Sequence, residues 1–319
     1  MNTLAYSSEV RDAVRRVGLT PEEVVDVLGS CLDGDDVYLV GSLAPDLGNA
    51  HSDIDLHVFV SDEAPGVVPM LFFAGRTRLD LVCHAVSSPA EALAKLPTVH
   101  VHLLSGVCAV GDLPGMTDLK RLSRWATAVP LFDGSPPIFA DDEVERIAAA
   151  LVRAALNTTV RAAALAHLMR TVGSPYAGLA WSRAAEAAVE VVVRTHGDIF
   201  VGDKWLPAKA RRCLMSPQVL ASARRVDSLT VYNQFVGALE LPIVDAPDLV
   251  TVEQTAGPGF TFGARCYRLV GGQLVPPIQI ESPMFARELE RDASALSDAV
   301  ASGAVMIDVD GRALDERLQ

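Results

Sequence analysis

The sequence predicts an α+β fold, with a mixed β-sheet and helices at the N-terminal end, then a helical bundle, then a small α+β module. Three observations support this prediction. Short apolar runs with the two-residue alternation of strands fill much of residues 37–85. Long amphipathic segments rich in Ala, Val and Leu fill residues 141–238. Short strand-like and helix-like segments return after about residue 250.

Breaks in composition set the predicted domain boundaries. Pro and Gly cluster at 130–137 in a stretch typical of a linker, and Pro and Asp cluster again at 242–248. The predicted domains are therefore residues 1–135, 136–242 and 243–319.

Local signals predict the individual elements. Thr20-Pro21-Glu22-Glu23 combines a cap, a proline in the first turn and a capping-box glutamate, so a helix should run from there to about Cys31. The other elements expected in the N-terminal part are strands at 37–41, 53–60, 67–74 and 77–85, the last two joined by Gly75-Arg76, and a helix from Ser88. Further along we expect helices at 141–171, 175–196, 206–214, 217–238 and 284–302, and strands at 264–270 and 304–309.

Composition limits the classes of partner. The formal net charge is −13, and proteins bind long nucleic acids mainly through Lys and Arg, so no nucleic-acid polymer is expected. The sequence has no run of eighteen apolar residues and no signal-peptide pattern at its start, so no membrane partner is expected. The five cysteines are scattered, with no CxxC pair, as in a reducing compartment. We therefore expect a cytoplasmic protein.

The chemistry is concentrated in residues 38–60. A predicted buried strand runs into Gly41-Ser42, and a loop then leads to a second strand with Asp53 and Asp55. Two carboxylates two residues apart on a strand point to the same face, and at about 4 Å they repel by roughly 4 kcal/mol at an effective dielectric near 20. Such a pair needs a counterion, and Mg²⁺ suits oxygen ligands. The Gly-Ser turn offers N–H groups and a hydroxyl to a phosphate.

A third carboxylate is expected from a neighbouring strand. Asp80 is the only acid in the apolar segment 77–85, and an acid there is costly unless it is paired or bound to a metal. The alternative is that Asp80 forms a salt bridge with Arg76 or Arg78.

These elements together resemble the polymerase-β-type nucleotidyltransferase superfamily. The resemblance lies in Gly41-Ser42, the eleven-residue step from Ser42 to Asp53, the run Ser52-Asp53-Ile54-Asp55, and the later strand Asp80. The resemblance covers about residues 36–85, and the helical domain expected after them fits the family only loosely. Among its members, the chain is most similar to small bacterial enzymes that modify antibiotics or other small molecules.

The resemblance implies roles for these residues. Asp53, Asp55 and Asp80 would hold two Mg²⁺ ions, and Asp80 would also assist removal of the acceptor proton. Gly41 and Ser42 would contact the terminal phosphates. The chain departs from the family at one position: many members carry a basic residue three positions after the motif serine, where this chain has Pro45.

Four further residues are candidates for the site. The chain has four lysines, and two of them, Lys204 and Lys209, lie in the segment 202–209. The resemblance makes both candidates for contact with the triphosphate, the alternative being a solvated helix start. Ser52 is a candidate contact whose alternative is to shape the turn. His57 shares the face of Asp53 and Asp55, and packing within the fold is the alternative for it.

The sequence therefore predicts a Mg²⁺-dependent nucleotidyltransferase that moves an NMP group, expected to be AMP from ATP, to a hydroxyl of a small molecule. Pyrophosphate is the second product. Two alternatives stay open: an enzyme that AMPylates a protein, and a non-catalytic nucleotide-sensing or antitoxin-like module on the same fold. The presence of all three acids favours catalysis. The acceptor and the base of the NTP are not specified, and a homodimer stays open.

Overall fold

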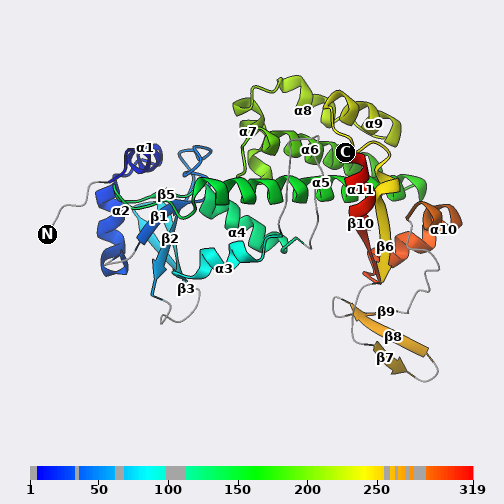
Figure 1. Cartoon of the computed structure of the whole chain (residues 1–319), viewed down its shortest axis with the longest axis horizontal. Helices are drawn as coiled ribbons and strands as arrows, with labels where there is room; N and C mark the ends of the chain where they lie inside the picture. Colours follow the sequence, from blue (N-terminus) through cyan, green and yellow to red (C-terminus); the bar gives the residue numbers. More distant parts are fainter. Residues whose placement is uncertain are drawn as a thin grey trace. The chain divides into compact units, whose positions relative to one another are not determined.

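A computed structural model describes residues 6–32, 36–61, 68–97, 113–254, 259–262, 265–270, 273–275 and 285–318. The fold is α+β, as predicted: the N-terminal half carries a mixed five-stranded sheet, and the middle of the chain is helical (Figure 1). The chain divides into two compact units. Unit 1 comprises the described residues within Met1–Val99, Gly111–Leu151 and Gly197–Lys209, and unit 2 those within Val152–His196 and Ala210–Gln319.

The sheet of unit 1 has the strand order β3-β4-β2-β1-β5. Its central strand β2 pairs in parallel with β4 and antiparallel with β1. The predicted hairpin is confirmed, since β3 and β4 pair antiparallel and Gly75 in their turn adopts a φ of +59°. The strands are β1 (Asp36–Val40), β2 (Ile54–Val60), β3 (Val68–Ala74), β4 (Thr77–Ala85) and β5 (Val129–Pro130).

One face of this sheet carries the core of unit 1. Helices α1 (Ser8–Arg16) and α2 (Pro21–Leu28) bury Val14 and Val24 in one apolar cluster with Leu56 of β2 and Leu81 of β4. Because strand side chains alternate between faces, the odd-numbered residues of β2 lie on the opposite face. The predicted cap of α2 is confirmed: the side chain of Thr20 accepts from the N–H of Glu23, whose carboxylate accepts from the N–H of Thr20.

Unit 1 is completed by helix α4 (Met116–Ala126) on that opposite face and by a segment from later in the chain. This helix, which sequence reasoning did not predict, buries Trp125 against His57 and Phe59 of β2. The hydroxyl of Ser123 in α4 donates to the carbonyl of Ile199 and accepts from the N–H of Val201, each at 2.9 Å. These two bonds fix the 197–205 segment to α4. The remaining elements are η1 (Gly29–Leu32), α3 (Ser88–Ala94), α4 (Met116–Ala126), η2 (Asp203–Trp205), α7 (Leu206–Arg212), which ends beyond the unit, and α5 (Asp141–Thr171), which continues in unit 2.

The helices of unit 2 correct one prediction. A single helix over 217–238 is wrong, because α8 (Pro217–Ala223) ends and α9 (Leu229–Ala238) begins after an extended residue, Ser228. The hydroxyl of Ser182 in α6 (Ala177–Thr195) lies 3.1 Å from the carbonyl oxygen of Arg224. The same hydroxyl lies 3.1 Å from the carbonyl oxygen of Gly178, so its single proton is shared between its own helix and the end of α8.

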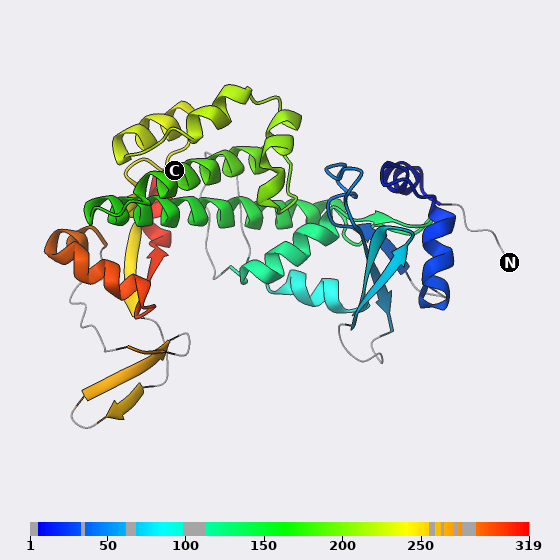
Figure 2. The same ribbon diagram turned by 180° about the vertical axis from the view of Figure 1, so that it is seen from behind.

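The C-terminal part of unit 2 is a small α+β arrangement. Strands β6 and β10 pair antiparallel and lie side by side in Figure 2, with α10 packed against them. Arg153 of α5, which is 1% exposed, forms an ion pair with Asp315 of α11. The elements are η3 (Ala246–Leu249), β6 (Val250–Gln254), β7 (Gly259–Phe262), β8 (Arg265–Val270), β9 (Gln273–Val275), α10 (Phe285–Ala301), β10 (Val305–Val309) and α11 (Gly311–Leu318). Positions 67, 264 and 284, at the edges of predicted elements, lie outside the described residues.

No helix in the described ranges combines the length and the apolar character needed to cross a bilayer.

Candidate functional site

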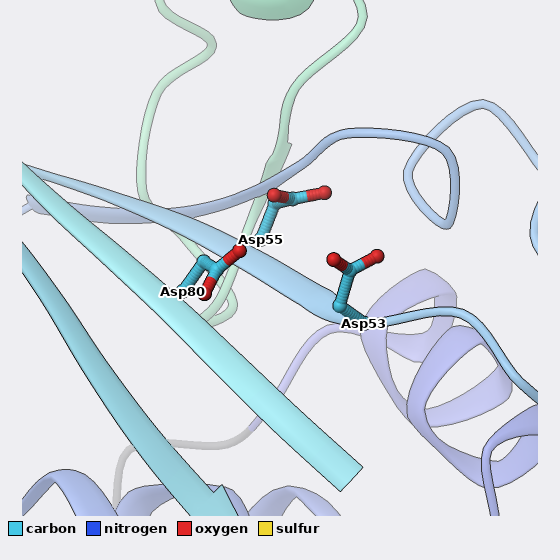
Figure 3. Close-up of side chains that lie close together, drawn as sticks. All are labelled: Asp53, Asp55 and Asp80. Atoms are coloured by element: carbon cyan, nitrogen blue, oxygen red, sulfur yellow. The ribbon is translucent and has the colours of Figure 1, made fainter.

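Three aspartates at two neighbouring strands converge on the face of the sheet opposite α1 and α2. Asp53 lies immediately before β2, Asp55 lies on it, and Asp80 of β4 is the register partner of Asp55. Directly paired residues on parallel strands point to the same face, so the three carboxylates face one another (Figure 3). One oxygen from each lies within 4.8 Å of the others. A single cation could therefore contact all three side chains.

Arg78 already contacts two of these carboxylates. It lies two residues before Asp80 on β4, and its Nη2 donates to Asp53 Oδ2 at 2.7 Å and to Asp80 Oδ2 at 2.5 Å. The alternative interpretation of Asp80, a salt bridge with a nearby arginine, is therefore present. All three side chains of this network are partly exposed, so the ion pairs are weak enough for another cation to displace them.

Asp55 is the least compensated of the three acids. Its own burial, and next the charge of Asp53, raise the pKa of Asp55 to about 6, and Arg124 and Arg78 offset this only in part. A raised carboxyl pKa means that an additional positive charge beside it would be favourable. The donor set consists of carboxylate oxygens alone, which are the ligands that Mg²⁺ and Mn²⁺ prefer. The residues present therefore fit a divalent cation.

The Gly41-Ser42 turn sits directly beside Asp55. Strand β1 ends at Val40, and Gly41 follows with a φ of +72°, a conformation that residues with side chains rarely adopt. A Cβ at Gly41 would also collide with the carboxylate of Asp55. Glycine is therefore needed at this position both for its backbone conformation and for space.

These groups line a single cavity of about 760 Å³ within unit 1. This volume is in the range of ligand pockets for small molecules and cofactors. Besides Gly41, Ser42 and the three aspartates, the cavity is bordered by β3, by α4 and by residues 200–205. The site thus combines strand acids with a backbone turn and with side chains from two helical segments.

The structure brings some of the other predicted residues to the cavity and not others. Lys204 lines it, and its ammonium lies 5.1 Å from the ring centroid of Trp205. Lys209 does not line it, because the side chain is fully buried and donates to the carbonyl of Phe200 at 3.0 Å. Ser52 is also outside the lining, and its hydroxyl accepts from the N–H of Asn49, which is the turn role weighed as its alternative.

His57 lines the cavity next to Asp55 but is largely buried. Its Nδ1 accepts from the indole N–H of Trp125 at 2.8 Å, which assigns the proton of the neutral ring to Nε2. Burial, and next the charge of His84, lower the pKa of His57 to about 3. His57 is thus a neutral group whose protonated Nε2 can donate a hydrogen bond and cannot coordinate a metal ion.

Sequence reasoning missed two cations on α4. Lys120 and Arg124 both line the cavity, and both are exposed. The only signal in the sequence is their spacing of four residues, which places them on one face of a helix. That spacing is uninformative until the helix is known to face the aspartates.

No family model and no curated protein matches the chain.

Proposed function

We propose that this protein is a metal-dependent nucleotidyltransferase that moves an NMP group, AMP from ATP being the first choice, to a hydroxyl of a small acceptor. The observation that carries the proposal is the convergence of Asp53, Asp55 and Asp80 beside the Gly41 turn. A two-metal transfer of this kind needs such a set of carboxylates and a backbone turn for the phosphates.

The three carboxylates would hold the divalent ions. When bound, such ions stabilise negative charge on the triphosphate and lower the pKa of the acceptor hydroxyl. In the transfer, the acceptor oxygen forms a bond to the α-phosphorus and the bond from that phosphorus to the β-phosphate oxygen breaks, so pyrophosphate leaves. The carboxylate of Asp80 takes the hydroxyl proton. Gly41 N–H and Ser42 Oγ bind the terminal phosphates.

The surroundings of the acids support this assignment. Asp55 is partly buried and its charge is not fully compensated, which favours a bound cation over an isolated carboxylate. Lys204 reaches the same cavity from a separate part of the chain, where it could pair with a phosphate. The cavity volume leaves room for a small acceptor beside a nucleotide.

The test is pyrophosphate release from each of the four common NTPs, with Mg²⁺ and a panel of hydroxylated acceptors. We expect Asp53→Asn to lower the rate about a hundredfold or more, because it removes one carboxylate from the set that holds the charge of the transition state. The matched control is Asp12→Asn, which removes an acid from the exposed surface of α1 and should leave the rate unchanged.

Two results would contradict the proposal. One is a transfer rate that Asp53→Asn leaves unchanged. The other is nucleotide binding without transfer to any acceptor, protein or small molecule, which would instead support the non-catalytic module.

A further inference from the structure

The lining of the cavity carries as many cationic side chains as acidic ones. Its lining includes four acids, of which Asp203 is the fourth, and four cations, Arg78, Lys120, Arg124 and Lys204. The lining is therefore neutral although the chain carries a formal charge of −13. Once divalent ions occupied the aspartates, the cavity would have an excess of positive charge. A ligand that completes it should therefore be a polyanion.

The cations of α4 differ in what they contact. Arg121 pairs with Asp118 and stacks on Trp125, so its charge is already used in the fold. Lys120 and Arg124, one residue before and three residues after Arg121, line the cavity, and in the described part of the chain neither side chain forms a hydrogen bond or an ion pair. Two cations on one helix face whose side chains form no ion pair are suited to an anionic ligand.

Arg124 lines the same cavity as the acidic centre, together with Asp55 and His57. Lys120 lies one helical turn before Arg124, at about 6 Å along the axis, so the two can contact successive phosphates of one chain.

We propose that Lys120 and Arg124 bind the polyphosphate of the nucleotide, with Lys204 completing the set. This inference rests on the proposed function. It assigns to α4 the phosphate contact that Pro45 cannot supply in this chain. The ligand class is a linear polyphosphate, as the triphosphate of an NTP.

The experiment measures binding of inorganic tripolyphosphate to the full chain by titration calorimetry in the presence of Mg²⁺. The double variant Lys120→Gln/Arg124→Gln should bind about tenfold more weakly than the wild type, because two charge-assisted contacts are lost at exposed positions. Each single variant should show part of this loss. The charge-preserving exchange Lys120→Arg/Arg124→Lys should stay within about threefold of the wild type.

The matched control is Arg11→Gln/Arg15→Gln. It removes the same charge from unit 1, at exposed positions of α1, which packs on the other face of the sheet. The affinity should change by less than about twofold, since charges beyond the Debye length of about 8 Å are largely screened at physiological salt. The inference would be overturned if the cavity and control double variants lost the same affinity for tripolyphosphate. It would also be overturned if the cavity double variant kept the affinity of the wild type.

The outcome separates the inference from the proposed function. Weaker tripolyphosphate binding in the cavity variants supports the phosphate role even if no acceptor undergoes transfer. Transfer with a KM for NTP that the cavity double variant leaves unchanged would overturn the phosphate role and leave the transferase proposal in place.

Discussion

Replacing Arg78 by Gln should make the acidic centre bind a divalent cation more tightly. The guanidinium donates to Asp53 and Asp80, so a metal that uses the same oxygens must displace it first. An exposed ion pair shifts an equilibrium by up to about fivefold. The two pairs share one guanidinium, so their effects should not multiply fully. We therefore expect Mn²⁺ to bind the Arg78→Gln variant about three- to tenfold more tightly than the wild type in the absence of nucleotide.

The assay is a Mn²⁺ titration followed by electron paramagnetic resonance of the free ion at neutral pH. Arg76→Gln is the matched control, because Arg76 lies in the same hairpin, carries the same charge and contacts none of the three aspartates. The Mn²⁺ affinity of the Arg76→Gln variant should differ from that of the wild type by less than about twofold. If the Arg78→Gln variant binds Mn²⁺ no more tightly than the Arg76→Gln variant, the guanidinium does not compete with the metal and the reasoning is refuted.

Three further outcomes are expected. Gly41→Ala should abolish transfer and weaken Mn²⁺ binding in a titration, since its Cβ collides with Asp55; unchanged binding would contradict the close approach. In the metal-free protein the pKa of Asp55 is about 6, above its unfolded value, so the native state binds more protons and the free energy of unfolding should fall by up to about 3 kcal/mol as pH rises from about 4 to 6. Urea unfolding across that range should show this fall in the wild type and not in Asp55→Asn. Arg153→Met should lower the stability of unit 2 by about 3 kcal/mol in thermal unfolding, because it leaves Asp315 without its buried partner; an unchanged Tm would refute this.

The sheet and its acids could be predicted because their signals are local. Asp53 and Asp55 share a face through the two-residue period of a strand, and an acid inside the apolar β4 strand indicated Asp80. The cap at Thr20 and the turn at Gly75 are likewise determined by neighbouring residues. Such features depend on a few adjacent side chains and are therefore visible in the sequence.

The remaining features depend on contacts between distant segments. Helix α4 carries no catalytic motif, and its relation to Asp55 is set by packing of Trp125 against β2. The direction of Lys209 depends on which face of α7 is buried, so a lysine predicted to reach a phosphate instead donates to the carbonyl of Phe200. The break between α8 and α9 lies next to Ser182 of α6, which is remote in sequence.

The most direct test of the central claim is a crystal structure of the protein with Mn²⁺ and a non-hydrolysable NTP analogue, with the ion located by anomalous scattering. The account predicts Mn²⁺ between Asp53, Asp55 and Asp80, with carboxylate oxygens at about 2.1 to 2.2 Å and Arg78 displaced from them. Mn²⁺ bound elsewhere, or Arg78 still between Asp53 and Asp80 with the nucleotide present, would contradict it.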